Sequence, residues 1–361
     1  MPARVLQSGR FRTQVHEVVA SAARARSKVS VAQHDARVSY VWNRRRGRVV
    51  RSSDLKQMRI GIVGTGWVGS SVAISTLHTG IATELLLYDL NAALAEGEAL
   101  DLAQGASFYP AASVRPASLD EMTGADAVVM AAGRGGRAGE SRLDLLRDNA
   151  TIVRSISERL AGLPGLLVIV TNPVDVMTYV ATQASGLPPA RVIGTGTMLD
   201  TARLRHVLGR ELAIDPRAIH AHVIGEHGDS EVVLWSTARA GGVALRQWPG
   251  WARDKEPALA DEVRRAAYEI IARKGATNHA IGLVTAALLR SALRDERRVL
   301  TVSRVQQGAL GIHDVAISLP AVVGGQGAMQ VLEPEMSAEE QAGLEHSVEL
   351  LRRATAKAHA L

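Results

Sequence analysis

The segment Gly225-Glu226-His227-Gly228-Asp229-Ser230 combines a histidine with acidic neighbours and with glycines that let the backbone turn. Histidine exchanges protons near neutral pH, because its unperturbed pKa lies close to the physiological range. An apolar run at 218–224 precedes the segment and predicts a strand. These residues are consistent with a proton donor at a strand end that faces a cleft. The same residue types also suit an ordinary surface turn, so the segment alone leaves both interpretations open.

A carboxylate and an arginine with suitable spacing come shortly before this segment. Asp200 and Arg203 lie three residues apart in a predicted helix at 197–212, so they share a face. If that face meets His227, Asp200 can orient the imidazole, and Arg203 can hold a substrate carboxylate through paired hydrogen bonds. The alternative is a plain intrahelical ion pair. Arg205 is turned about 200° from Arg203 around the helix and must point elsewhere.

A glycine-rich loop directly after the first clear strand predicts a dinucleotide site. The loop Gly64-Thr65-Gly66-Trp67-Val68-Gly69 follows an apolar strand at 58–63 and precedes a helical pattern at 72–78. Asp89 ends the next strand, where a carboxylate would accept a hydrogen bond from a ribose 2′-hydroxyl and repel a 2′-phosphate. NAD is therefore favoured over NADP. The predicted cofactor-binding residues are Gly64, Gly66, Val68, Gly69 and Asp89.

The order of predicted elements indicates how these residues are positioned. Strands alternate with helices from residue 58 to residue 194, which is typical of a doubly wound parallel sheet of the Rossmann type. Ligands bind at the carboxyl ends of such strands. A mixed α+β region follows, so the α/β chain is predicted to comprise a basic extension at 1–57, an NAD-binding domain at 58–195 and a substrate domain at 196–361.

Three further connections could reach a ligand. The stretch 133–142 holds four glycines and three arginines, including Arg137 and Arg142, and predicts a mobile, anion-seeking lid over the site. Asn172 ends another strand, where its amide could bind a substrate or the nicotinamide ribose. Thr277 lies at a break between two helical patterns, where its side chain could reach a cleft.

Composition excludes several classes of function. The chain has no cysteine, which excludes disulfides, thiolate catalysis and cysteine-based metal sites. His220 and His222 lack a nearby third ligand, so no metal site is predicted. No apolar run reaches the roughly 18 residues that cross a bilayer.

The net charge of +6 comes from the N-terminal segment. Residues 1–57 hold 13 of the 42 lysines and arginines but only three of the 36 acidic residues, which leaves the remainder with a net charge of −4. Three hypotheses fit this segment: a disordered or non-native extension, an organelle-type presequence, or a basic arm that touches nucleic acid. Sparse aromatic residues disfavour the arm, so no nucleic-acid partner is expected.

Taken together, the motifs resemble the L-lactate/malate dehydrogenase family, and within it the bacterial lactate members. The resemblance covers residues 58–356. It rests on the glycine loop and on four further motifs in the family's order: Gly-Glu-Ser-Arg at 139–142, Thr-Asn-Pro-Val-Asp at 171–175, Leu-Asp-Thr-Ala-Arg at 199–203 and the histidine segment at 225–230.

This resemblance implies roles for individual residues in the reduction of a 2-keto acid by NADH. His227 falls on the catalytic acid/base, Asp200 on its partner carboxylate and Arg203 on the arginine that binds the substrate carboxylate. Arg142 falls on the lid arginine that polarises the carbonyl. Asn172 and Thr277 fall on the family's substrate-side residues.

The resemblance also implies partners and a specificity question. Arg205 and His220 match the residues that bind fructose 1,6-bisphosphate in allosteric bacterial members, and a cytoplasmic homotetramer that acts in glycolytic pyruvate fermentation is expected. At the lid position that usually carries Gln in lactate enzymes and Arg in malate enzymes, this chain has Gly136, with Arg137 beside it. Pyruvate is favoured as substrate, while oxaloacetate and bulkier 2-keto acids stay open. A non-catalytic NAD-binding regulator is the alternative from another class.

Overall fold

The computed structural model describes residues 40–43, 48–51, 57–135 and 142–359, and the chain divides into two units, Met1–Lys56 and Gln57–Leu361. In the smaller unit, β1 (Tyr40–Asn43) and β2 (Arg48–Arg51) pair antiparallel, although the sequence predicted no strand there. Such an isolated pair is of marginal stability by itself. The three hypotheses for 1–57 concern mainly residues outside the described ones.

The larger unit is built on one nine-stranded sheet in the order β16-β15-β14-β8-β7-β6-β3-β4-β5. Six neighbouring strands of this sheet are parallel, in the order β5-β4-β3-β6-β7-β8. This is the Rossmann order, which confirms the predicted doubly wound fold. Their bounds are β3 (Arg59–Val63), β4 (Glu84–Tyr88), β5 (Ser113–Pro116), β6 (Ala127–Met130), β7 (Leu166–Ile169) and β8 (Val192–Gly194).

Three antiparallel strands extend this sheet rather than forming a sheet of their own. They are β14 (Arg298–Gln307), β15 (His313–Gly324) and β16 (Gly327–Val331). The junction is a single pairing of Ser303 with Gly194. The mixed α+β region predicted after residue 195 did not indicate this attachment.

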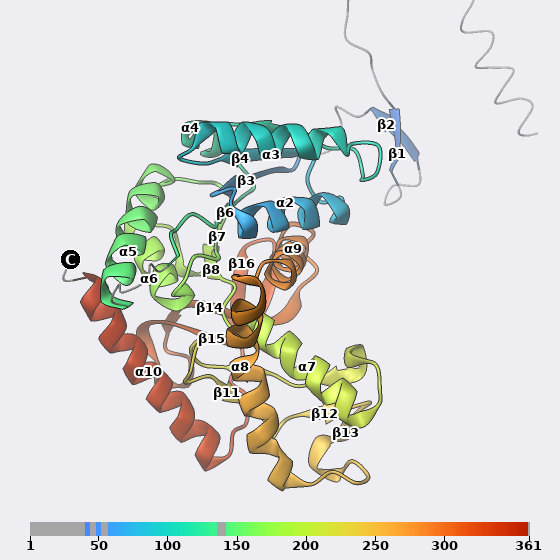
Figure 1. The fold of residues 1–361 in the computed structure, drawn as a ribbon, viewed down its shortest axis with the longest axis vertical. Helices are drawn as coiled ribbons and strands as arrows, with labels where there is room; N and C mark the ends of the chain where they lie inside the picture. The colour runs from blue at the N-terminus through green and yellow to red at the C-terminus, as the bar shows by residue number, and fades with distance from the viewer. Residues whose placement is uncertain (1–39, 44–47, 52–56, 136–141, 360–361) are drawn as a thin grey trace, which may run out of the picture. The chain divides into compact units, whose positions relative to one another are not determined.

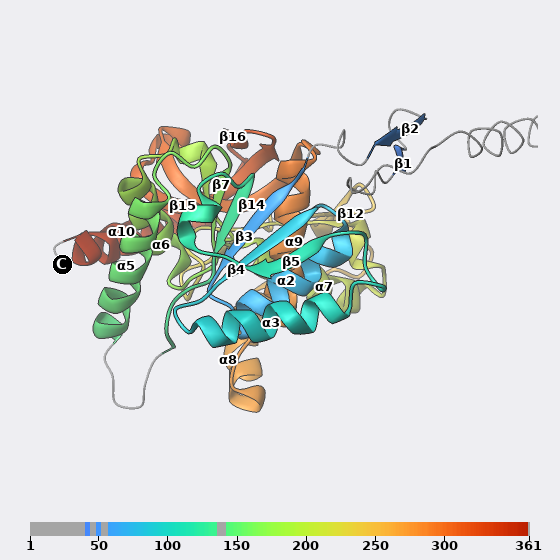
Figure 2. The same cartoon turned by 90° about the horizontal axis from the view of Figure 1, so that it is seen from above.

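Helices cover both faces of the sheet (Figure 1, Figure 2). Alternate residues of the buried strands enter two different cores, as Ile60 and Ile62 of β3 do on one face and Val128 and Met130 of β6 on the other. The first face carries α2 (Trp67–Thr79), α3 (Ala92–Gln104) and α9 (His279–Leu293). The second carries α4 (Leu119–Met122), α5 (Arg142–Arg159), α6 (Val174–Ser185) and α10 (Ala338–His359).

A third core lies under α7 (Met198–Leu212) and α8 (Glu256–Lys274). The predicted single strand at 218–224 is wrong. Its halves, β9 (Ile219–His220) and β10 (Val223–Ile224), pair with different partners, β12 (Arg239–Ala240) and β11 (Val232–Val233), so the ladder breaks at residues 221–222. The remaining elements are β13 (Val243–Ala244) and short 3₁₀ turns at Pro189–Arg191, Pro216–Ala218, Leu245–Gln247, Arg253–Lys255 and Ala309–Gly311.

The predicted break between α8 and α9 is present, with Gly275 at a φ of +87° ending α8. Within the described part of the chain, no helix is long and apolar enough to cross a membrane.

Candidate active site

His227, Asp200 and Arg203 meet at one point. Asp200 lies in the first turn of α7 and is 2% exposed. Its Oδ2 lies 2.6 Å from His227 Nδ1, and its Oδ1 accepts a hydrogen bond of 2.7 Å from Arg203 Nη1. The helix face that carries Asp200 and Arg203 therefore does meet His227. The His227 side chain stays 24% exposed, which leaves part of the ring open to a substrate.

The charges in this cluster favour a protonated imidazole. Enclosure alone would lower the pKa of His227, but the charge and the hydrogen bond of Asp200 outweigh it and raise the pKa to about 9. Burial would raise the pKa of Asp200, yet the positive charges of His227 and Arg203 hold it below its ordinary value. The pair therefore stays charged at neutral pH, with the proton on His227.

Two buried acids near His227 were not assigned a role from the sequence. Asp175, in the first turn of α6, accepts a hydrogen bond of 2.8 Å from the His227 backbone N–H through Oδ2. Burial raises the pKa of Asp175 to about 6. Glu231 is 6% exposed, and burial together with the negative charge of Asp200 raises its pKa to about 8. The sequence signal that could have identified Asp175 is its position. It is an acidic residue between two valines, at the end of the Thr-Asn-Pro-Val-Asp motif.

The glycine loop fits a dinucleotide. Gly64 has a φ of +91°, and a Cβ there would lie 2.5 Å from the Ala132 nitrogen. A Cβ on Gly69 would lie 1.8 Å from the Gly64 carbonyl oxygen, whereas a Cβ on Gly66 would meet nothing within 4 Å. The chain itself therefore requires two of the glycines, and the third leaves open space where a pyrophosphate can approach the backbone.

The start of α2 and the end of β4 complete this cofactor site. Ser70 donates the first helical hydrogen bond, to the Gly66 carbonyl, so the Val68 amide lies upstream of that bond and can serve a phosphate. Asp89 accepts hydrogen bonds from the backbone amides of Thr65 (2.8 Å) and Asn91 (2.9 Å), which fixes its carboxylate beside the loop.

Asn172 and Thr277 both lie in connections between elements. Asn172 is exposed, and Thr277 is half-buried. Asn149 links the first of these to the start of the predicted lid. Its side chain donates to the Asn172 carbonyl (3.0 Å) and accepts from the Arg134 backbone amide (2.9 Å). Next to Thr277, Asn278 donates to Ser71 Oγ on α2 (2.9 Å).

Most of the predicted lid, residues 136–141, lies outside the described residues. Gly136 and Arg137 lie outside the described residues. Arg142 is the first residue of α5, and its side chain also lies outside the description.

A second cluster of positive charge surrounds Arg205 and His220. Arg205 Nε donates to the Ala221 carbonyl at 3.2 Å, which places its guanidinium beside the segment that carries His220 and His222. Burial, followed by the charges of Arg205 and His220, lowers the pKa of His222 to about 4. Arg298 also acts on Arg205, whose pKa is lowered mainly by burial. Within the described ranges no group of three His, Asp or Glu residues is arranged to hold a metal ion.

Comparison with known proteins agrees with this geometry. The sequence models for the NAD-binding domain and the alpha/beta C-terminal domain of lactate/malate dehydrogenase match residues 58–194 and 197–361. L-lactate dehydrogenase 2 of Enterococcus faecalis is 44% identical over 305 residues, which cover 82% of this chain and 96% of that protein. L-lactate dehydrogenase of Thermus aquaticus is 44% identical over 304 residues, covering 82% and 98%.

A solved structure shows the same fold. The minor L-lactate dehydrogenase of Enterococcus mundtii, in a ligand-bound form, superposes with a TM-score of 0.81 at 39% identity, covering 83% of this chain and 98% of that one. The first sequence model contains the glycine loop, and the second contains His227, Asp200 and Arg203. The chain belongs to the lactate/malate dehydrogenase family.

Proposed function

We propose that the chain is an NAD-dependent L-lactate dehydrogenase that reversibly reduces pyruvate to L-lactate in the cytoplasm, as in glycolytic pyruvate fermentation. The contact between His227 Nδ1 and Asp200 Oδ2 at 2.6 Å, with Arg203 on the other carboxylate oxygen, carries this proposal. The names of the relatives support the choice of lactate within the family.

The proposed mechanism assigns one task to each side chain. NAD held at the glycine loop would supply or accept the hydride. Because Asp200 occupies Nδ1, Nε2 is the ring nitrogen of His227 left to protonate the keto oxygen. Arg203 holds Asp200 through Nη1, and the rest of its guanidinium is available for the substrate carboxylate. Arg142 stabilises the negative charge that develops on the oxygen, in a site closed by the lid.

The remaining residues complete the two halves of the site. Residues 58–195 hold NAD through the glycine loop and Asp89, and residues 196–361 supply the acid/base and the carboxylate clamp. Asn172 contributes to both cofactor and substrate binding, and Thr277 faces the substrate. The matches of the family's two sequence models support this division.

Substrate choice depends on the lid. Gly136 offers no contact to a substrate side chain, which leaves pyruvate, bulkier 2-keto acids and, through Arg137, oxaloacetate as candidates. Pyruvate is the proposed substrate because the relatives that match most of the chain are L-lactate dehydrogenases. The test is kcat/KM for pyruvate and for oxaloacetate with NADH. A preference for pyruvate of tenfold or more, about 1.4 kcal/mol, is expected. A strong preference for oxaloacetate would make the chain a malate dehydrogenase. Absence of turnover with pyruvate, oxaloacetate and bulkier 2-keto acids would leave a regulator that binds NAD without catalysis.

The pH dependence of the reaction follows from the raised pKa of His227. Pyruvate reduction needs the imidazolium, so kcat/KM should stay level below pH 9 and fall about tenfold per pH unit above it. Lactate oxidation needs the neutral ring and should rise with pH up to the same value. Steady-state rates of pyruvate reduction and of lactate oxidation, measured from below to above pH 9, test whether the two pH dependences run in these opposite directions. A reduction rate that rises through pH 9 would contradict the assignment.

The proposal includes an effector site for fructose 1,6-bisphosphate at Arg205 and His220. The guanidinium of Arg205, which lies beside the segment that carries His220, would attract the phosphates of the sugar. We expect the bisphosphate to lower the apparent KM for pyruvate in dilute enzyme. An unchanged KM would sink this part of the proposal.

A homo-oligomer, expected to be a tetramer, is also part of the proposal. Large apolar side chains are exposed on three helices: Trp67 of α2 is 62% exposed, Tyr268 of α8 52% and Leu283 of α9 65%. A second copy would cover them. Light scattering of the purified full chain gives the number of copies.

A further inference from the structure

The C-terminal helix α10 holds the segment that carries His227. Ser347 of α10 is fully buried, and its Oγ accepts a hydrogen bond of 2.6 Å from the Glu226 backbone N–H. Ser230, on the other side of His227, has its Oγ 3.1 Å from Ser347 Oγ and donates to Glu226 Oε2 at 2.5 Å. One serine from α10 thus contacts the segment before and after the histidine.

Two consecutive backbone amides are held by side chains from two different helices. Glu226 N–H donates to Ser347 of α10, and His227 N–H donates to Asp175 of α6 at 2.8 Å. These two hydrogen bonds hold the peptide units on both sides of Glu226 and so restrain the path of the backbone into His227. A third helix, α7, then fixes the ring through Asp200.

The fit between α10 and this segment is close. Gly225 has a φ of +89°, and a Cβ there would lie 2.9 Å from Ser347 Oγ. The Gly225 backbone also pairs with Ser318 of β15 in both directions, at 2.9 and 3.1 Å. The segment therefore has little room to shift while these contacts persist.

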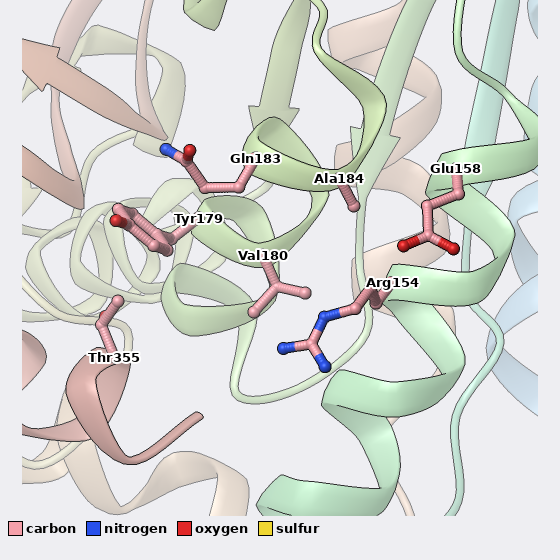
Figure 3. Close-up of a pocket in the computed structure, with 7 residues that line it drawn as sticks. All are labelled: Arg154, Glu158, Tyr179, Val180, Gln183, Ala184 and Thr355. Carbon is pink, nitrogen blue, oxygen red and sulfur yellow. The ribbon is translucent and has the colours of Figure 1, made fainter. Parts of the chain in front are cut away.

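Helix α10 is itself anchored at both sides of Ser347. Leu344, Val348 and Leu351 enter the core shared with α5 and α6. Near the end of the helix, Arg154 of α5 donates through Nη2 to the Ala358 carbonyl at 3.2 Å. Figure 3 shows Arg154 beside the hollow where α5, α6 and Thr355 of α10 come together. The anchored helix α10 therefore holds Ser347 in a defined position, where it contacts the histidine segment.

We propose that Ser347 is a positioning residue for the general acid, acting through the Glu226 and Ser230 contacts on the His227–Asp200 pair. This inference rests on the proposed function of His227. Ser347 lies more than a hundred positions after His227 in the sequence. Its proposed task is to keep Nδ1 of His227 on Asp200 and Nε2 toward the substrate.

The test is Ser347→Ala, which removes the hydroxyl and leaves the helix. We expect kcat for pyruvate reduction to fall roughly tenfold, because small misplacements of a catalytic group cost up to about a hundredfold in rate. The KM for pyruvate and the affinity for NADH should stay within about twofold. The pH at which reduction declines should move downward from about 9, because the contact with Asp200 loosens.

Ser291→Ala is the matched control. Ser291 is also fully buried, and its Oγ donates to a backbone carbonyl, that of Val323, at 3.0 Å, but on α9 away from the histidine segment. It should lower the midpoint of thermal unfolding and leave kcat and the pH profile unchanged. Equal effects of the two substitutions on the pH profile would overturn the proposal, as would a Ser347→Ala enzyme with wild-type kcat and pH profile.

A second variant covers the case in which Ser347→Ala does not fold. Ser230→Ala breaks the same network from a half-buried position, and an unchanged pH profile there would overturn the proposal. The pKa of His227 can also be followed by NMR titration, with its signal assigned from the His227→Gln spectrum. This measurement needs no turnover. A wild type inactive on pyruvate would refute the proposed substrate, whereas an unshifted His227 pKa in Ser347→Ala would refute the positioning role.

Discussion

His227→Gln is expected to lower kcat/KM for pyruvate reduction by roughly 10²- to 10⁴-fold, the contribution of a positioned general acid. Glutamine keeps a polar side chain of similar length but cannot release a proton to the keto oxygen. The backbone N–H that binds Asp175 remains, so the segment should keep its path. The substitution leaves the glycine loop, the proposed NADH site, unchanged, so the dissociation constant of NADH, followed by nicotinamide fluorescence, should stay within about twofold.

The control for this substitution is His346→Gln, which changes an exposed histidine on α10. It should leave both kcat/KM and NADH binding at the wild-type level. Near-wild-type turnover of His227→Gln would show that another group protonates the substrate, and a parallel loss of NADH binding would point to misfolding instead.

Arg203→Gln should raise KM for pyruvate and lower kcat/KM by roughly 30- to 5,000-fold. The substitution removes the proposed partner of the substrate carboxylate, and truncating one member of a desolvated charge pair costs about 2–5 kcal/mol. It also removes one of the two charges that hold the pKa of Asp200 below its ordinary value. Steady-state kinetics over a wide pyruvate range separates the two parameters.

Two variants frame this result. Arg203→Lys keeps the charge but not the planar fork, so it should retain part of the lost activity. Arg210→Gln, on the same helix, breaks an exposed ion pair with Glu262 and should have no effect on KM. If Arg203→Gln binds pyruvate as the wild type does, the carboxylate must be held elsewhere.

The parallel part of the fold could be predicted from local patterns. The strand predicted at 58–63 ends at Val63 as β3 does, and strands alternate with helices up to Val192–Gly194 as predicted, because apolar runs and helical periodicity are local signals. Attachment of β14 to β8 could not be predicted. It depends on Ser303 meeting Gly194, and no local pattern encodes which strand a distant strand pairs with.

The same distinction between local and distant contacts applies to the site. The three-residue spacing of Asp200 and Arg203 indicated a shared face, and the structure shows that face against His227. Asp175 lies 52 residues before His227, and Ser347 lies 121 residues after Glu226. Neither contact leaves a trace in spacing. Both contacts arise from the packing of α6 and α10 against the histidine segment.

The proposed acid/base role depends on Asp200 holding the proton on His227. The most direct test compares the pH dependence of kcat/KM for pyruvate in the wild type and in Asp200→Asn. The wild type should decline above about pH 9. In Asp200→Asn the charge that raises the pKa of His227 is gone, so the decline should move down toward the unperturbed histidine value of about 6.5 or below. A decline at the same pH in both enzymes would contradict the account.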